Sequence, residues 1–255
     1  MAYWIRFAHA GKSQIGTLEA DTISVHSGEL FADARPTGVS LPLSAVKLLT
    51  PVIPGKLIGL WNNFHERAKA EGLSKPEHPL YFIKPDTCYL AEGETIRRPA
   101  GYAGKIVFEG ELGVVIGKTC RGVSAAEAGA YIFGYTCVND VTARDILKCD
   151  PSFVQWSRAK GYDSFGPFGP GIRTEVDPSS LSVRVLVNGA EKQNYPVADM
   201  FYGPHEIVSR LSHDMTLNPG DIISCGTSSG AGPILAGDSV QVVIDGVGTL
   251  TNPVA

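Results

Sequence analysis

The sequence has few of the features that define several large protein classes. It contains 5 cysteines in 255 residues, an odd number, and none forms a CxxC pair. They are Cys88, Cys120, Cys137, Cys149 and Cys225. This scattered pattern argues against a disulfide framework and against a zinc-finger site, and it favours a reduced, cytoplasmic protein.

Long apolar runs and dense basic clusters are also missing. No segment approaches the roughly 18 apolar residues that a membrane-spanning helix needs. The stretch MAYWIRFAHAGKS lacks the apolar region of a signal peptide. The formal net charge of −4 argues against a nucleic-acid partner, because such proteins are usually basic. We therefore expect neither a membrane nor a nucleic acid as a partner.

The expected elements exclude a doubly wound nucleotide-binding fold, since strands and helices do not alternate and no GxGxxG is present. Hydrophobic residues make up 44% of the chain, which is too many for general disorder. Strand-like segments dominate, with hairpin signals in VLVNGAEK and VVIDGVGT. Helices are expected in HERAKAEG, SAAEAGAYI and FYGPHEIVSRLSH. The predicted division is a small N-terminal β unit with a linker over 1–54, followed by a second domain over 55–255.

Two glutamates stand in the segment KIVFEGELGVVIGK, 105–118, which is otherwise typical of a buried strand. Residues two apart on a strand point to the same face, so Glu109 and Glu111 are expected side by side, with Cβ atoms ~7 Å apart. Two buried carboxylates repel each other and need protons, Lys or Arg side chains, or a metal ion to neutralise them. The alternative is a solvent-facing strand edge, where water or lysine meets the glutamates.

A third acid favours the metal. Asp140 ends an apolar run in GYTCVNDVTARD and can fold back beside Glu111. Three carboxylates at one site suit a Mg²⁺-type centre with open positions for water or substrate. Lys160, in RAKGYDSFGPFGPG, is either an anchor for an anionic substrate or a solvated surface lysine. The loop CGTSSGAG, 225–232, is either a cradle of amides for a carboxylate or a plain turn.

Four motifs together resemble the fumarylacetoacetate hydrolase family. FEGELGVVIGK, GYTCVNDVTARD, AKGYDSFGPFGP and CGTSSG follow one another in that family's order, within residues 56–252. The resemblance implies an α+β, mostly β fold, namely a mixed β-roll with few short helices, and a homodimer. It also implies small 2-oxo acid or β-dicarbonyl substrates, often from aromatic-compound catabolism.

The resemblance also implies roles for individual residues. Mg²⁺ or Mn²⁺ would be held by the residues that match the family's three acids, Glu109, Glu111 and Asp140. Lys160 matches the family's active-site lysine. The substrate-binding positions that the resemblance implies are Arg144, Gly226 and Thr227.

The segment LIGLWNNFHERAKAEG, 57–72, resembles the part of the family that carries a catalytic histidine, here His65. A histidine pKa lies near working pH, so this side chain can act as a general base. Without the resemblance, His65 is typical of a helix start or a surface. Hydrolytic members usually have Glu where this chain has Ala68 and Gln where it has Leu147, and these departures favour isomerase or decarboxylase chemistry.

The sequence thus predicts a divalent-metal-dependent hydrolase that cleaves a C–C bond in a small acylpyruvate or β-diketo acid. An isomerase, tautomerase or decarboxylase that acts on a related 2-oxo or 2-hydroxydienoic acid is the first alternative. The second alternative is a non-catalytic homologue that binds a small molecule.

Overall fold

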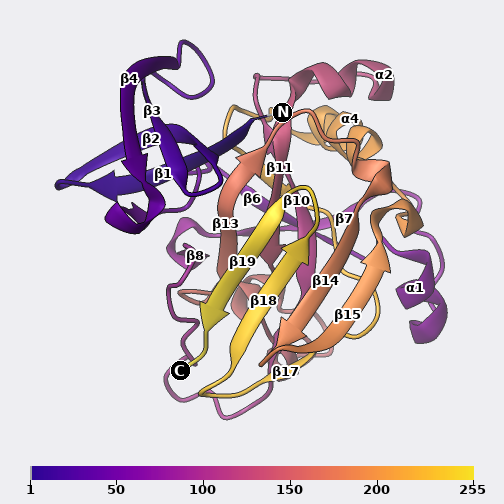
Figure 1. Ribbon diagram of the computed structural model, residues 1–255. Helices are drawn as coiled ribbons and strands as arrows, with labels where there is room; N and C mark the ends of the chain where they lie inside the picture. Colours follow the sequence, from indigo (N-terminus) through magenta and orange to yellow (C-terminus); the bar gives the residue numbers. More distant parts are fainter. Residues whose placement is uncertain (1) are drawn as a thin grey trace.

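A computed structural model describes residues 2–255, and its main feature is a twelve-stranded sheet (Figure 1). Ten strands form the path across it: β4 (Arg35–Pro42), β3 (Thr22–Ser27), β2 (Lys12–Glu19), β1 (Tyr3–His9), β13 (Gly166–Arg173), β11 (Ile132–Asn139), β10 (Gly110–Ile116), β16 (Ile222–Ser224), β6 (Leu57–Trp61) and β7 (Leu80–Lys84). Two short strands pair beside this path, β5 (Lys47–Leu48) on β1 and β8 (Tyr89–Leu90) on β13.

Two smaller sheets complete the β-structure of the described residues. One has three strands in the order β12 (Thr142–Ala143), β9 (Ile106–Phe108) and β17 (Gly232–Ile234). The other has four, in the order β15 (Ala190–Pro196), β14 (Ser182–Val187), β18 (Ser239–Ile244) and β19 (Gly248–Pro253). Alternate residues of β14 and β18 are buried, so one face of this sheet packs on the core and the other meets solvent.

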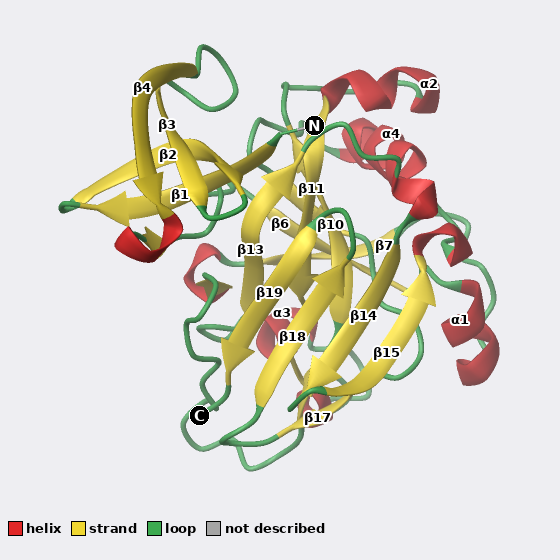
Figure 2. Ribbon diagram, in the orientation of Figure 1, coloured by secondary structure: helices red, strands yellow, loops and turns green. Residues whose placement is uncertain are grey.

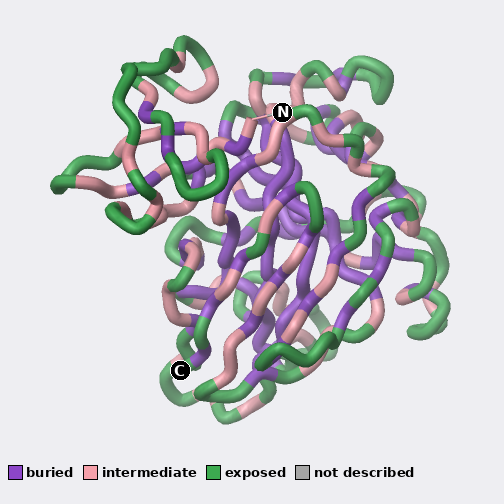
Figure 3. Tube along the Cα trace, viewed as in Figure 1, coloured by how far each residue is buried: buried purple, intermediate pink, exposed green. Residues whose placement is uncertain are grey.

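The core lies between the four-stranded sheet and the central strands of the large sheet. β14, β18 and β19 contact β10, β11 and β13, and Figure 1 shows the two layers one behind the other. Every residue of β10 is buried, and Figure 3 shows the buried part of the chain concentrated in this central region. A strand covered on both faces is expected to be continuously apolar, as GVVI is.

The helices are short; in Figure 2, α1, α2 and α4 lie to one side of the sheets, and α3 lies behind the four-stranded sheet. They are α1 (His65–Glu71), α2 (Ala125–Ala128), α3 (Trp156–Lys160) and α4 (Pro204–Asp214). α4 has a buried apolar stripe at Ile207, Val208 and Leu211, spaced as an amphipathic helix requires. In the part of the chain that the structure describes, no helix is long and apolar enough to cross a membrane.

Most elements expected from the sequence are confirmed, including the mostly β, α+β fold class. The three expected helices are present as α1, α2 and α4. The hairpin predicted at VLVNGAEK joins β14 to β15, with Asn188 at φ +53° and Gly189 at φ +79°. Positive φ at both positions is what the Asn-Gly type I′ turn demands.

β13 was not expected, because its sequence GPFGPGIR resembles a loop. It nevertheless lies in the middle of the large sheet, between β1 and β11. The neighbouring strand β1 leaves room only for a small residue on β13, since a Cβ at Gly171 would lie 2.6 Å from the carbonyl oxygen of Trp4. A Cβ at Gly134 on β11 would likewise lie 2.4 Å from the carbonyl oxygen of Arg173. Close approach of three backbones therefore explains these glycines.

The first five strands form a unit with its own small apolar cluster. Tyr3, Ile5, Phe7, Ile23 and Val25 are the buried members of this cluster. β1 joins the unit to the large sheet through its antiparallel pairing with β13. The domain boundary after residue 54 stays a prediction.

Candidate metal centre and active site

Glu109 lies where the chain crosses between two sheets. β9 ends one residue before Glu109, and β10 begins one residue after it. The prediction of a single strand over 105–118 is therefore wrong. The N–H of Glu109 donates to the side-chain Oδ1 of Asn139 at 3.1 Å instead of to a backbone carbonyl of a neighbouring strand. Gly110 makes the crossing possible, because a Cβ there would lie 2.2 Å from Cγ2 of Val185.

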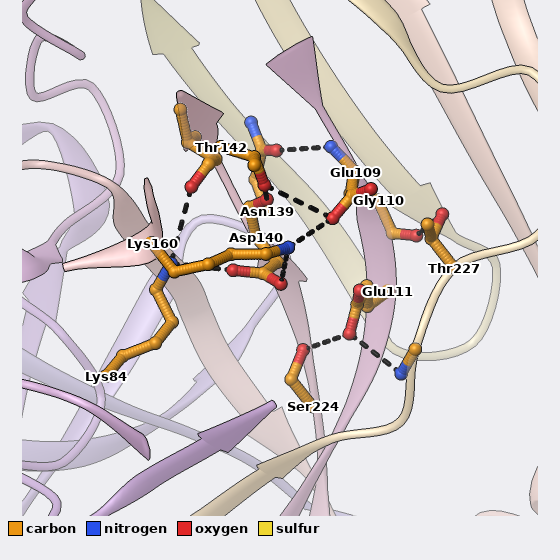
Figure 4. A network of polar contacts seen from close by, with 12 residues as sticks. Lys84, Glu109, Gly110, Glu111, Asn139, Asp140, Thr142, Lys160, Ser224 and Thr227 are labelled. Carbon is orange, nitrogen blue, oxygen red and sulfur yellow. Dashed lines mark hydrogen bonds and ion pairs between the residues drawn. The ribbon is translucent and has the colours of Figure 1, made fainter. Parts of the chain in front are cut away.

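The three acids expected to gather do so (Figure 4). Glu109, Glu111 and Asp140 are all buried, and one carboxylate oxygen from each lies within 4.8 Å of the other two. Asp140 directly follows β11, and its N–H donates to the carbonyl oxygen of Glu109 at 2.8 Å. Three converging carboxylates are a donor set that fits a hard divalent cation such as Mg²⁺ or Mn²⁺. Their convergence is confirmed, and their role as metal ligands stays a prediction.

Two buried lysines and an arginine neutralise the acids. Nζ of Lys160 donates to both Glu109 and Asp140, and Nζ of Lys84 donates to Oδ1 of Asp140 at 2.6 Å. Nη1 of Arg67 donates to Oε1 of Glu109 at 3.3 Å. Buried charges are expected to be paired in this way. A divalent ion at this site would therefore share its ligands with cations of the protein.

Two hydrogen-bond donors hold Glu111, and burial outweighs their preference for its ionised form. Its Oε2 accepts from Oγ of Ser224 at 2.5 Å and from the N–H of Gly226 at 2.8 Å. Burial raises the pKa of Glu111 to about 8, and the negative charge of Asp140 adds to the rise. The amide of Gly226, which the sequence offered as part of a carboxylate cradle, thus holds a carboxyl group of the protein itself.

Glu109 behaves in the opposite way. Burial alone would raise its pKa, but the ammonium of Lys160 and the guanidinium of Arg67 outweigh this and lower the pKa to about 2. Burial alone would lower the pKa of Lys160, and the carboxylates of Asp140 and Glu109 reverse this and raise it. The site therefore holds an ionised carboxylate, a protonated lysine and a neutral carboxyl group side by side at neutral pH.

The pKa of Glu111 makes metal affinity depend on pH. A metal ligand must lose its proton, so the affinity for Mn²⁺ is expected to fall roughly tenfold for each pH unit below about 8. Near neutral pH, binding should release about one proton. Calorimetric titration of Mn²⁺ in buffers of different ionisation enthalpy measures both quantities. An affinity that does not change with pH in this range would contradict the assignment of Glu111.

A cavity of about 980 Å³ opens onto Glu109 and Lys160. Of the predicted substrate-binding residues, Arg144 lines it. Thr227 does not, because its buried hydroxyl donates to the carbonyl oxygen of Gly110 at 2.9 Å. The remaining lining residues are Trp61, Arg67, Glu71, Leu73, Pro79, Leu80, Tyr81, Phe82, Asp145, Leu147, Lys148, Val154 and Trp156.

His65 lies apart from this group. It is exposed at the start of α1 and does not line the cavity, and its ring centroid is 4.1 Å from that of Phe201. Ala68, one turn later, is buried and offers no carboxylate to orient an imidazole. The catalytic role of His65 stays a prediction.

Three residues at the site were missed in the sequence. Lys84 has a usable signal, since a lysine that ends the apolar strand LYFIK needs a charged partner if it is buried. Arg67 has a weaker signal, because Glu71, four residues later on the expected helix, already offers it a partner. Ser224 has no signal in the sequence, because a serine at the end of a short strand is common and does not by itself indicate a functional site.

A mostly β fold that gathers three buried carboxylates and a lysine, with Glu109 and Lys160 lining a cavity, is the arrangement of an enzyme acting on small molecules. The family described as "Fumarylacetoacetate (FAA) hydrolase C-terminal" matches residues 56–255, and "Rv2993c-like, N-terminal" matches residues 4–51. The chain belongs to the fumarylacetoacetate hydrolase family.

Two relatives illustrate the range of the family. Protein Rv2993c of Mycobacterium tuberculosis is 44% identical over 227 residues, which are 88% of this chain and 84% of the relative. Oxaloacetate tautomerase YisK of Bacillus subtilis is 34% identical over 255 aligned residues, with 92% of this chain and 84% of the relative covered.

Two solved structures share the whole fold. The 2-hydroxyhepta-2,4-diene-1,7-dioate isomerase from Mycobacterium marinum has a TM-score of 0.91 and 40% identity, with 100% of this chain and 98% of that chain covered. The maleylpyruvate hydrolase from Sphingobium sp. SYK-6, in complex with manganese(II) and pyruvate, has a TM-score of 0.82 and 27% identity, with 100% and 99% covered.

Proposed function

We propose that this protein is a divalent-metal-dependent isomerase that interconverts keto and enol, or double-bond, isomers of a small 2-oxo acid. The acid cluster would hold Mg²⁺ or Mn²⁺, and the ion would supply positive charge to the 2-oxo acid head and to the enolate that forms from it. Lys160 is protonated and buried, donates to Glu109 and Asp140, and lines the cavity, so its ammonium group would stabilise an enolate oxygen bound there.

One observation carries the choice of isomerisation over hydrolysis. Hydrolysis needs a base that activates water, and the expected candidate, His65, is exposed and outside the cavity lining. The helix position that supplies an orienting Glu in hydrolytic relatives is Ala68. Isomerisation needs no activated water: the ammonium group of Lys160 would stabilise the enolate, and a carboxylate of the cavity lining, Glu71 or Asp145, would accept the proton and return it.

Hydrolysis of an acylpyruvate, favoured by the sequence, is the second candidate. It is supported by the similarity to the maleylpyruvate hydrolase and by the place of His65 on α1, the helix whose Arg67 and Glu71 line the cavity. Decarboxylation would use the same enolate and the same lysine.

Product analysis tests the proposal. The protein with Mn²⁺ or Mg²⁺ is incubated separately with oxaloacetate, an acylpyruvate and a 2-hydroxymuconate-type dienoate. We expect a change in ultraviolet absorbance at constant molecular mass with at least one of them. Release of pyruvate with an acid would favour the hydrolase, and release of CO₂ the decarboxylase. Binding without any turnover would favour the non-catalytic homologue.

His65→Ala separates the first two candidates. Because His65 lies outside the cavity lining, isomerisation should fall by less than about threefold, whereas loss of a general base from a hydrolase typically costs roughly a hundredfold or more. His78→Ala, an exposed histidine on the loop after α1, is the matched control. A hundredfold loss of isomerisation in His65→Ala alone would place the histidine in the reaction and contradict this reading of the site.

A further inference from the structure

Three aromatic side chains form one side of the cavity, and they are called the aromatic wall here: Trp61, Phe82 and Trp156. The rings of Phe82 and Trp156 are parallel, with an interplanar angle of 2° and centroids 5.3 Å apart. Trp61 packs against Trp156 at 5.7 Å with a tilt of 55°. All three residues line the cavity, and none has a part in holding the acid cluster.

The wall is fixed by the sheet beneath it. Phe82 on β7 is buried and pairs in register with Gly59 on β6. A Cβ at Gly59 would lie 2.4 Å from Cζ of Phe82, so the ring lies in the space that the glycine leaves. Rigid aromatic surfaces of this kind select ligands by shape because they lose little conformational freedom on binding.

The wall begins at the reacting end of the cavity. Nζ of Lys160 lies 5.1 Å from the ring centroid of Phe82, and Trp156 starts the helix, α3, that ends at Lys160. A substrate whose 2-oxo acid head lies at Lys160 would therefore place its substituent along the rings. Among the cationic lining residues, Arg144 and Lys148 are exposed and solvated by water. Arg67 is already paired with Glu71 and Glu109, and the wall is partly to fully buried.

We propose that the aromatic wall determines specificity, and that the enzyme prefers 2-oxo acids with a flat, apolar substituent, aryl or conjugated dienyl, over acids with a second carboxylate at the far end. Phe82 backs Trp156, and the half-buried rings of Trp61 and Trp156 offer the cavity an apolar surface against which a planar π-system packs and which excludes the water that a carboxylate requires. This inference rests on the proposed function, which places the 2-oxo acid head at the acid cluster.

Calorimetric binding to the Mn²⁺-loaded protein tests it without turnover. The probes share one head: pyruvate, 4-phenyl-2-oxobutanoate and 2-oxoadipate. We expect the phenyl probe to bind about tenfold more tightly than pyruvate, and 2-oxoadipate to bind no more tightly than pyruvate. Trp156→Leu should reduce the phenyl advantage to below about threefold. Because Trp156 starts the helix of Lys160, Trp61→Leu serves as a second variant outside that helix, with the same expected direction.

Trp4→Phe is the control, because Trp4 lies on β1 and packs against His26 and Phe133, away from the cavity. It should keep the full phenyl advantage. Tighter binding of 2-oxoadipate than of the phenyl probe, no phenyl advantage in the unmodified protein, or an advantage that survives in both Trp61→Leu and Trp156→Leu would overturn the inference while leaving the proposed function intact. If pyruvate itself fails to bind in the presence of Mn²⁺, both proposals fall.

Discussion

Replacement of Glu111 by glutamine is expected to weaken Mn²⁺ binding at least about 100-fold and to abolish turnover, while the protein stays folded. Loss of a group that merely orients a ligand already costs roughly 10- to 100-fold in metal affinity, and Glu111 is proposed to be a ligand itself. The fold should tolerate the change, because a glutamine oxygen still accepts from Ser224 and from the N–H of Gly226. Burial also keeps Glu111 largely neutral near pH 7 in the metal-free protein.

Glu19→Gln is the matched control, since Glu19 is an exposed residue at the end of β2. Metal affinity is measured by calorimetry and folding by thermal melting of the metal-free proteins. Retention of both Mn²⁺ binding and activity in Glu111→Gln would show that Glu111 is not a metal ligand. Loss of folding in the metal-free variant would show that the carboxyl group has a structural role instead.

Lys160→Met is expected to destabilise the metal-free protein by about 3–5 kcal/mol, because it leaves two buried carboxylates without their shared partner. Mn²⁺ should recover much of this loss, since a divalent ion can neutralise Glu109 and Asp140 in place of the ammonium group. Turnover should nevertheless fall roughly 100-fold or more even with metal bound, because the donor to the enolate is gone.

Lys118→Met, an exposed lysine after β10, controls for the loss of a positive charge. Urea unfolding with and without Mn²⁺ gives the stabilities, and the product assay gives the rates. Unchanged stability in the metal-free Lys160→Met protein would mean that the buried ion pairs contribute nothing net. Full activity in the metal-loaded variant would exclude Lys160 from catalysis.

The sequence predicted the parts of this molecule that depend on local pattern. The β-rich fold is predicted by the Val- and Ile-rich strands and by the Asn-Gly turn at Asn188. These signals can be recognised in the sequence because each depends on only a few neighbouring residues. The two-residue spacing of Glu109 and Glu111, with Asp140 at a strand end, was enough to predict that three acids gather. The three acids converge even though the strand is interrupted at Glu109.

The remaining features depend on distant neighbours. β13 is a strand because it pairs with β1 and β11, and its Gly- and Pro-rich sequence gives no local sign of this pairing. Lys84 pairs with Asp140, 56 positions away, only because β7 returns beside the acid cluster. The aromatic wall likewise brings Trp156 against Phe82 by tertiary packing alone.

A crystal structure of the protein soaked with Mn²⁺ and pyruvate tests the central claim most directly. Anomalous scattering should place one ion in contact with carboxylate oxygens of Glu109, Glu111 and Asp140, with pyruvate on the cavity side within reach of Lys160. A peak elsewhere in the molecule, or no peak at saturating Mn²⁺ with the carboxylates still bound to the two lysines, would contradict it.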